Sequence, residues 1–133
     1  MDEREFKRRT KAVALRVIRL VDTLPKSRTA DVIGRQLLRS GTSIGANYRA
    51  ACRGVSRADV IAKLGDVEEE ADESLYWLEL LIDAKIVPEG KLAPLMKEVG
   101  EILAMIVASI RTLRASNRKS KIQNPKSTKS KDD

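Results

Sequence analysis

The sequence contains no histidine, and its 133 residues include a single cysteine, Cys52. Without histidine, a Ser–His triad cannot form, and neither can a zinc site of mixed Cys and His ligands or the Glu-x-x-His di-iron site of helical bundles. These absences remove most hydrolytic mechanisms. We therefore expect no enzymatic activity, no metal and no cofactor, and no small-molecule substrate is evident.

Long apolar runs are also missing. The longest, near residues 102–107, is far shorter than the roughly 20 residues that span a bilayer. The first residues, MDEREFKRRTK, lack the apolar segment of a signal peptide, and one cysteine cannot form an internal disulfide. We expect a cytoplasmic protein without a membrane partner, in which Cys52 is a small packing residue.

Aromatic residues make up only 3% of the chain, so the core must consist mostly of Leu, Ile, Val and Ala. This composition is typical of packed helices, and the apolar residues recur at helical intervals of three and four. The pattern predicts an all-α fold with helices at about residues 3–24, 30–53, 57–84 and 90–116. The basic remainder, 117–133, has almost nothing apolar and is expected to be a disordered tail.

The stretch from residue 33 to 56 sorts its side chains onto three sides of one helix. One side is apolar and is expected to face the core. Beside it, Gly34, Gly41 and Gly45 form a seam without bulk, where another backbone can approach closely. A local break of the helix near these glycines is the alternative explanation. The remaining side is lined by four arginines, Arg35, Arg39, Arg49 and Arg53.

Several residues next to the apolar sides are expected to have structural roles. The apolar side of the second helix is bordered by three polar residues, Ser40, Ser43 and Asn47. Their positions predict hydrogen bonds between helices or to the backbone. Trp77 and Leu81 lie about 100° from the main apolar stripe of the third helix, which indicates a second contact surface. The residues assigned to interhelical packing are Ser43, Asn47, Tyr48 and Trp77.

The net charge of +7 is unevenly spread, because the second helix and the tail are basic while the third helix is acidic. A basic surface of this kind favours a nucleic-acid partner. Alternatively, the arginines meet the acidic third helix of a neighbouring subunit, or they are simply solvated. The candidate residues for binding nucleic acid or a partner are Arg35, Arg39, Arg49, Arg53, Arg118, Lys119 and Lys121.

Four segments carry a resemblance to a known family: QLLRS at 36–40, SIGANYR at 43–49, SRAD at 56–59 and EADESLYWLELL at 70–81. They resemble the four-helix-bundle proteins first noticed as reading frames within intervening sequences of bacterial 23S ribosomal RNA genes. The resemblance implies an up-down-up-down antiparallel bundle that assembles into a homopentameric ring, without known catalytic activity. Similar accessory variability proteins of diversity-generating retroelements bind a reverse transcriptase and nucleic acid through a basic surface.

These observations lead to one main functional hypothesis and one alternative. The main hypothesis is a non-enzymatic, homo-oligomeric four-helix bundle whose basic surface binds RNA or a nucleic-acid-handling partner. Phosphate contacts would dominate, since few aromatic residues are present to stack on bases. The alternative is a structural or adaptor module whose arginines form the contacts between subunits.

Overall fold

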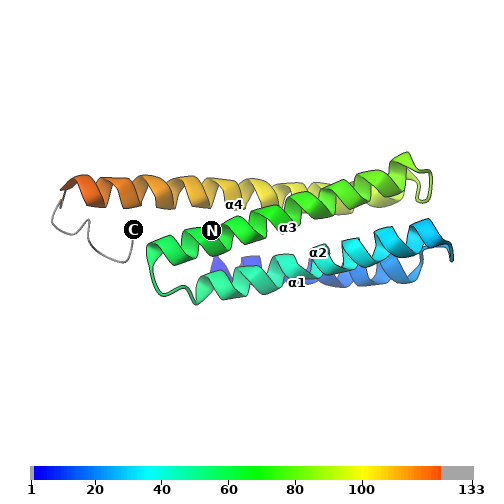
Figure 1. The fold of residues 1–133 in the computed structure, drawn as a ribbon, viewed down its shortest axis with the longest axis horizontal. Helices are drawn as coiled ribbons and strands as arrows, with labels where there is room; N and C mark the ends of the chain where they lie inside the picture. The colour runs from blue at the N-terminus through cyan, green and yellow to red at the C-terminus, as the bar shows by residue number, and fades with distance from the viewer. Residues whose placement is uncertain (1, 124–133) are drawn as a thin grey trace.

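The computed structural model describes residues 2–123, and within this range it contains four α-helices and no strand (Figure 1). The helices are α1 (Glu3–Asp22), α2 (Arg28–Cys52), α3 (Arg57–Asp83) and α4 (Glu89–Gln123). Consecutive helices pack side by side along the chain order, whereas α1 and α4 meet at few points. The predicted all-α fold of four packed helices is therefore confirmed.

The starts of the first three helices are fixed by side-chain caps. Asp2, Ser27 and Ser56 each accept a hydrogen bond from a backbone N–H two or three residues later. These contacts satisfy N–H groups that the helix itself leaves unpaired. Asp59 completes the cap of α3, because its carboxylate accepts the Val55 N–H at 3.1 Å. The observed ends of these helices lie within two residues of the predicted ends.

The last helix is longer than predicted. We expected it to end at residue 116, but α4 continues to Gln123. Residues 117–123 contain neither proline nor glycine, so no residue stops the helix, and the cations there interact favourably with its C-terminal dipole. The rest of the predicted tail, 124–133, lies outside the described residues.

The core runs along the bundle axis and receives buried apolar side chains from all four helices. Near one end, the rings of Phe6 from α1 and Tyr48 from α2 pack with centroids 4.5 Å apart. On α3, Leu81 is fully buried, so the second contact surface that it indicated lies within the bundle. Since α3 packs against both α2 and α4, it needs a wider apolar arc than one stripe. Trp77 is half-buried beside Tyr76.

The glycine seam of α2 is where α1 packs. A Cβ atom added to Gly41 would lie 2.8 Å from Val17 Cγ2, and one added to Gly45 would lie 3.0 Å from Thr10 Oγ1. At Gly34 the nearest atom would be Leu24 Cδ1, at 3.1 Å. The helix itself is continuous from Arg28 to Cys52, so the glycines allow close packing rather than a break.

A buried serine pair joins α2 to α3. The hydroxyl of Ser74 donates to Ser40 Oγ at 2.8 Å, and both residues are fully buried. The expected hydrogen bond between helices is thus made by Ser40. Ser43 instead donates to the Arg39 carbonyl of its own helix at 2.6 Å, and Asn47 is half-buried.

Within residues 2–123, no helix is both long and apolar enough to cross a membrane.

Candidate nucleic-acid interface

Two of the four predicted arginines on α2 are engaged within the chain. Arg35 forms an exposed ion pair with Asp31 one turn earlier, at 2.7 Å. Arg39 reaches across to α3, where it pairs with Glu70 at 3.2 Å and with Glu73. The arginine side of α2 therefore contacts the acidic helix α3. At Arg39, however, this contact joins two helices of the same chain rather than two subunits. Arg39 is consequently a poor candidate for phosphate binding.

Arg49 lies in a groove between α1 and α2 of about 500 Å³. The α1 side of this groove carries four further cations, and the small residues Gly45 and Ala46 lie between the two rows. Lys7 and Arg8 pair with carboxylates of their own helix. The cations lining this groove that form no ion pair with any described residue are Arg4, Lys11 and Arg49.

The connection between α2 and α3 adds two more arginines. Arg53 is the C-cap of α2, and Arg57 is the first residue of α3. Neither forms an ion pair with a residue in the range 2–123. From residue 32 to residue 58 the sequence contains no carboxylate at all, and the next one, Asp59, pairs with Lys63.

The second half of α4 is likewise free of carboxylates, from residue 102 to 123. Figure 1 shows this part of α4 projecting past the connection between α2 and α3. Its cations are exposed, and Lys121 lies in the same helix, although its side chain is outside the described part. We call this end of the bundle the basic end. Its cations are Arg49, Arg53, Arg57, Arg111, Arg114, Arg118 and Lys119.

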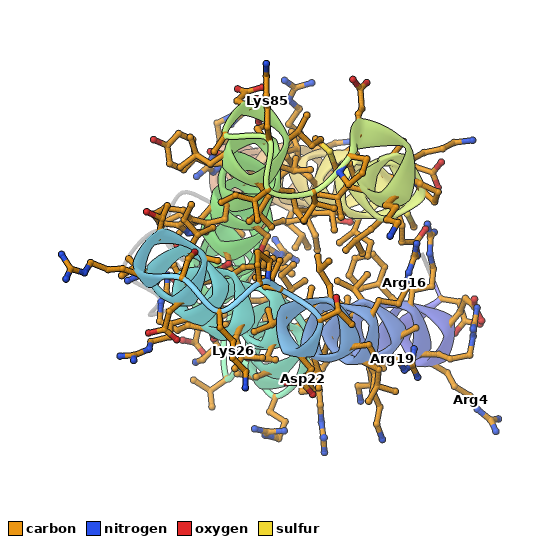
Figure 2. The ribbon with its side chains drawn as sticks, turned by 90° about the vertical axis from the view of Figure 1, so that its right-hand side faces the viewer. Arg4, Arg16, Arg19, Asp22, Lys26 and Lys85 are labelled. Carbon is orange, nitrogen blue, oxygen red and sulfur yellow. The ribbon has the colours of Figure 1, made fainter. Side chains whose placement is uncertain are left out.

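The two carboxylate-free stretches are close in space as well as similar in composition. Cys52 at the end of α2 and Thr112 of α4 line the same groove. At the opposite end of the bundle, seen from the front in Figure 2, the charges are mixed. There, Arg19, Lys26 and Lys85 point outward together with Asp22. The two sequence stretches without carboxylates thus meet at the end of the bundle that is opposite to this mixed surface.

The predicted site residues are only partly brought together. Arg49, Arg53, Arg118 and Lys119 gather at the basic end, whereas Arg35 and Arg39 are engaged nearer the middle of α2. Sequence reasoning missed three members of the basic end: Arg57, Arg111 and Arg114. The signal that identifies them is the absence of carboxylates from residue 32 to 58 and from residue 102 to 123.

The chemistry available at the basic end is the binding of anions. Guanidinium groups suit phosphate oxygens, because their planar donors can form two hydrogen bonds at once. Within residues 2–123, no group of three or more His, Cys, Asp or Glu side chains is placed to hold a metal ion. The arrangement offers several separated cations on helical supports, which suits a polyanion better than a single small anion.

Comparison with known proteins is consistent with this fold. The family model of the 23S rRNA-intervening sequence protein matches residues 3–108. A crystal structure of a protein with unknown function from the S23 ribosomal protein family of Bacteroides thetaiotaomicron VPI-5482 is 37% identical, with a TM-score of 0.74. The alignment covers 79% of this chain and 97% of that one. No protein of curated function matches the sequence. Because the family model spans most of the four-helix bundle, this chain belongs to the 23S rRNA-intervening sequence protein family.

Proposed function

We propose that this chain is a non-enzymatic RNA-binding bundle whose basic end holds RNA phosphates. The proposal rests on one observation: two carboxylate-free stretches, 32–58 and 102–123, meet at one end of the molecule and carry arginines without ion-pair partners among the described residues. Binding a phosphate at each cation releases counterions, so such a surface binds polyanions with little sequence preference. The family resemblance adds that similar accessory variability proteins bind nucleic acid through a basic surface, which supports a nucleic acid as the polyanion.

Removing the charges of α4 tests this proposal. We expect the combined substitutions Arg111→Gln, Arg114→Gln, Arg118→Gln and Lys119→Gln to weaken RNA binding by roughly 10- to 100-fold at about 0.1 M salt. The slope of log K against log salt should become shallower by about 0.7 for each phosphate of single-stranded RNA that the variant no longer neutralises. Fluorescence anisotropy with a labelled RNA across a salt series measures both quantities. All four positions are exposed, so the fold should be retained.

The control removes an equal charge from the other end of the molecule. Arg16→Gln, Arg19→Gln, Lys91→Gln and Lys97→Gln neutralise four cations on α1 and on the first half of α4. This variant keeps the basic end and should bind RNA nearly as well as the natural chain. Equal losses for both variants would show that net charge alone governs binding, and no binding by the natural chain would refute the proposal.

A second candidate function is self-association into a structural or adaptor ring, and a separate surface favours it. The outward side of α3 carries Glu69, Asp72, Glu79 and Asp83 around Tyr76, which is 54% exposed. None of these carboxylates pairs with a cation among residues 2–123. An exposed aromatic residue is typical of a protein–protein contact, and the unpaired charges around it would select a partner of opposite charge.

The complementary features lie on the other side of the chain. Leu15 and Ile18 of α1 are 44% and 39% exposed, and Leu38 of α2 is 37% exposed. Cations lie near these residues in the sequences of both helices, and on α1 they include Lys11 and Arg19. The acidic side of one copy would then contact the basic side of the next. Because such a contact joins two different surfaces, it can close into a ring, such as the homopentamer implied by the family resemblance.

Reversing the charge of the α3 surface tests self-association. We expect Asp72→Lys with Glu79→Lys to reduce the mass measured by light scattering to that of a monomer, because like charges would then face each other across the contact. Asp66→Lys is the control, since Asp66 is exposed on the same helix but about 120° away from Asp72. A natural chain that is already monomeric at micromolar concentrations would exclude this candidate.

A further inference from the structure

The basic end contains an apolar groove of about 690 Å³. The groove lies beside the start of α1, and residues of α2, α3 and α4 form most of its lining. Its volume falls within the usual range of about 300–1,000 Å³ for small-molecule sites.

The walls of this end groove are mainly apolar. Val60 and Leu64 of α3 face Met105 and Leu113 of α4 across it. Leu64 is nearly inaccessible, whereas the other three are half-buried, so the groove is lined by apolar atoms that still contact water. A ligand that covered them would gain hydrophobic stabilisation.

Hydrogen-bonding groups are placed among these apolar walls. Ser109 and Thr112 contribute hydroxyl groups from α4, and Tyr48 and Cys52 lie beside each other on α2. Burial is the main cause that raises the pKa of Tyr48, so its hydroxyl stays protonated at neutral pH. These groups are neutral donors and acceptors, which suit the edge of a nucleobase better than a charged group.

Cations border the groove on its α2 and α4 sides, whereas its carboxylates lie beside the starts of α1 and α3. Arg53 follows the groove residue Cys52 directly, and Arg111 and Arg114 flank Thr112 and Leu113 on α4. The one carboxylate in the lining belongs to Glu3, and it is paired with Lys7 at 2.9 Å. An apolar hollow with neutral polar groups is thus bordered by cations. This combination is complementary to a nucleotide, which joins an apolar, hydrogen-bonding base to an anionic phosphate.

We propose that the end groove takes an unstacked base of single-stranded RNA, while the neighbouring phosphates lie on the arginines of the basic end. This inference rests on the proposed RNA-binding function and adds the class of RNA. A base within a duplex is stacked and paired, so inserting it would require flipping it out at a cost of a few kcal/mol. A base in a single strand is available without this cost, and it presents both its faces and its edges.

The affinity test fills the groove without changing any charge. The substitutions Ala108→Leu and Ser109→Leu place two larger side chains in its α4 wall. For this variant, we expect the affinity for a single-stranded RNA of about 20 nucleotides to fall about tenfold, in line with the loss of one bound base. The affinity for a duplex of the same length should change less than about twofold, because duplex binding uses phosphate contacts alone.

Ala104→Leu provides the matched control, because Ala104 is exposed on the same helix and does not line the groove. This variant should bind both RNA forms as the natural chain does. If the filled variant binds the single strand as tightly as the control variant, the inference is wrong. Circular dichroism and thermal melting verify that both variants keep the helical fold.

Cys52 offers a second readout that does not depend on affinity. It lines the groove, is partly accessible and is the only cysteine of the chain, so its alkylation reports on this position alone. Saturating single-stranded RNA should slow the alkylation of Cys52 by iodoacetamide at least about fivefold, whereas saturating duplex should leave the rate unchanged.

The two experiments separate the inference from the function on which it rests. If single-stranded and duplex RNA bind equally well and neither protects Cys52, the groove does not take a base, while RNA binding at the basic end stands. If neither form of RNA binds the natural chain, the proposed function itself fails. Preference for the single strand together with protection of Cys52 supports the inference.

Discussion

Replacing Gly41 with alanine is expected to lower the free energy of unfolding by about 2 kcal/mol, within the usual range for overpacking a core. The added Cβ would lie 2.8 Å from Cγ2 of Val17 and 3.0 Å from its Cγ1. Val17 is fully buried and β-branched, so its side chain has little freedom to turn away. The helix α1 must therefore shift away from α2. Chemical denaturation followed by circular dichroism measures the decrease in stability.

Gly65 supplies the matched control for this prediction. It lies inside α3, and a Cβ atom added there meets nothing within 4 Å. Gly65→Ala should therefore stabilise the protein by about 0.5–1 kcal/mol, the difference in helix propensity between the two residues. If Gly41→Ala stabilised the chain by a similar amount, close packing of α1 on the glycine seam would not be the reason for these glycines.

The glycine seam shows which structural features can be predicted from this sequence. Gly34, Gly41 and Gly45 share one side of α2, and their cost in helix propensity indicates that a partner backbone compensates for it. The start of α3 carries a similarly local signal, because the capping Ser56 lies three positions before Asp59, whose N–H it binds. These are local signals, and helical periodicity is enough to interpret them.

The incomplete parts of the prediction have a different origin. The helical wheel places Leu81 on a second contact surface but cannot name the partner there, because it does not show that α3 packs against both α2 and α4. The predicted end of α4 lies too early, because the prediction assumes that a segment with few apolar side chains to bury is disordered. An established helix can continue by adding one backbone hydrogen bond per residue, and this requires no core. Residues 117–123 extend α4 in this way.

The candidate site depends on distances between residues that are far apart in sequence. Arg39 meets Glu70, a residue 31 positions later, only because α2 and α3 pack in a particular register. Periodicity places Arg39 on the same side as Arg49, but it gives no information about that register. The basic end likewise forms because the end of α2 lies beside the second half of α4. Sequence alone identifies its cations but not their grouping.

The contact between α1 and α4 depends strongly on one arginine, and Arg9→Met is expected to reduce stability by about 1–2 kcal/mol. This value lies between the effects of breaking exposed and buried ion pairs. Arg9 donates to both carboxylate oxygens of Glu98, at 2.9 and 2.8 Å, and to Glu101 at 3.1 Å. Its side chain is 20% exposed and that of Glu98 is 24% exposed, so water screens the pair only partly. Thermal and denaturant unfolding of both proteins measure the difference in stability.

The pH dependence of this difference distinguishes the ion pair from simple packing. Hydrogen bonds from Arg9 are the main cause that lowers the pKa of Glu98 below its usual value. A carboxyl whose pKa is lowered by folding contributes stability above its unfolded pKa, and this contribution disappears as the pH falls through the folded pKa. The stability difference between the natural chain and Arg9→Met should therefore be largest near neutral pH and shrink under acid.

Arg8→Met is the control for the Arg9 substitution, because Arg8 is more exposed and pairs only with Glu5 of its own helix among the described residues. It should destabilise the protein less than Arg9→Met does, since it breaks no contact between helices. A deficit of Arg9→Met that stays constant from neutral to acidic pH would mean that the apolar stem of Arg9, rather than its charge, attaches α1 to α4. A deficit that disappears under acid would assign this attachment to the ion pair with Glu98.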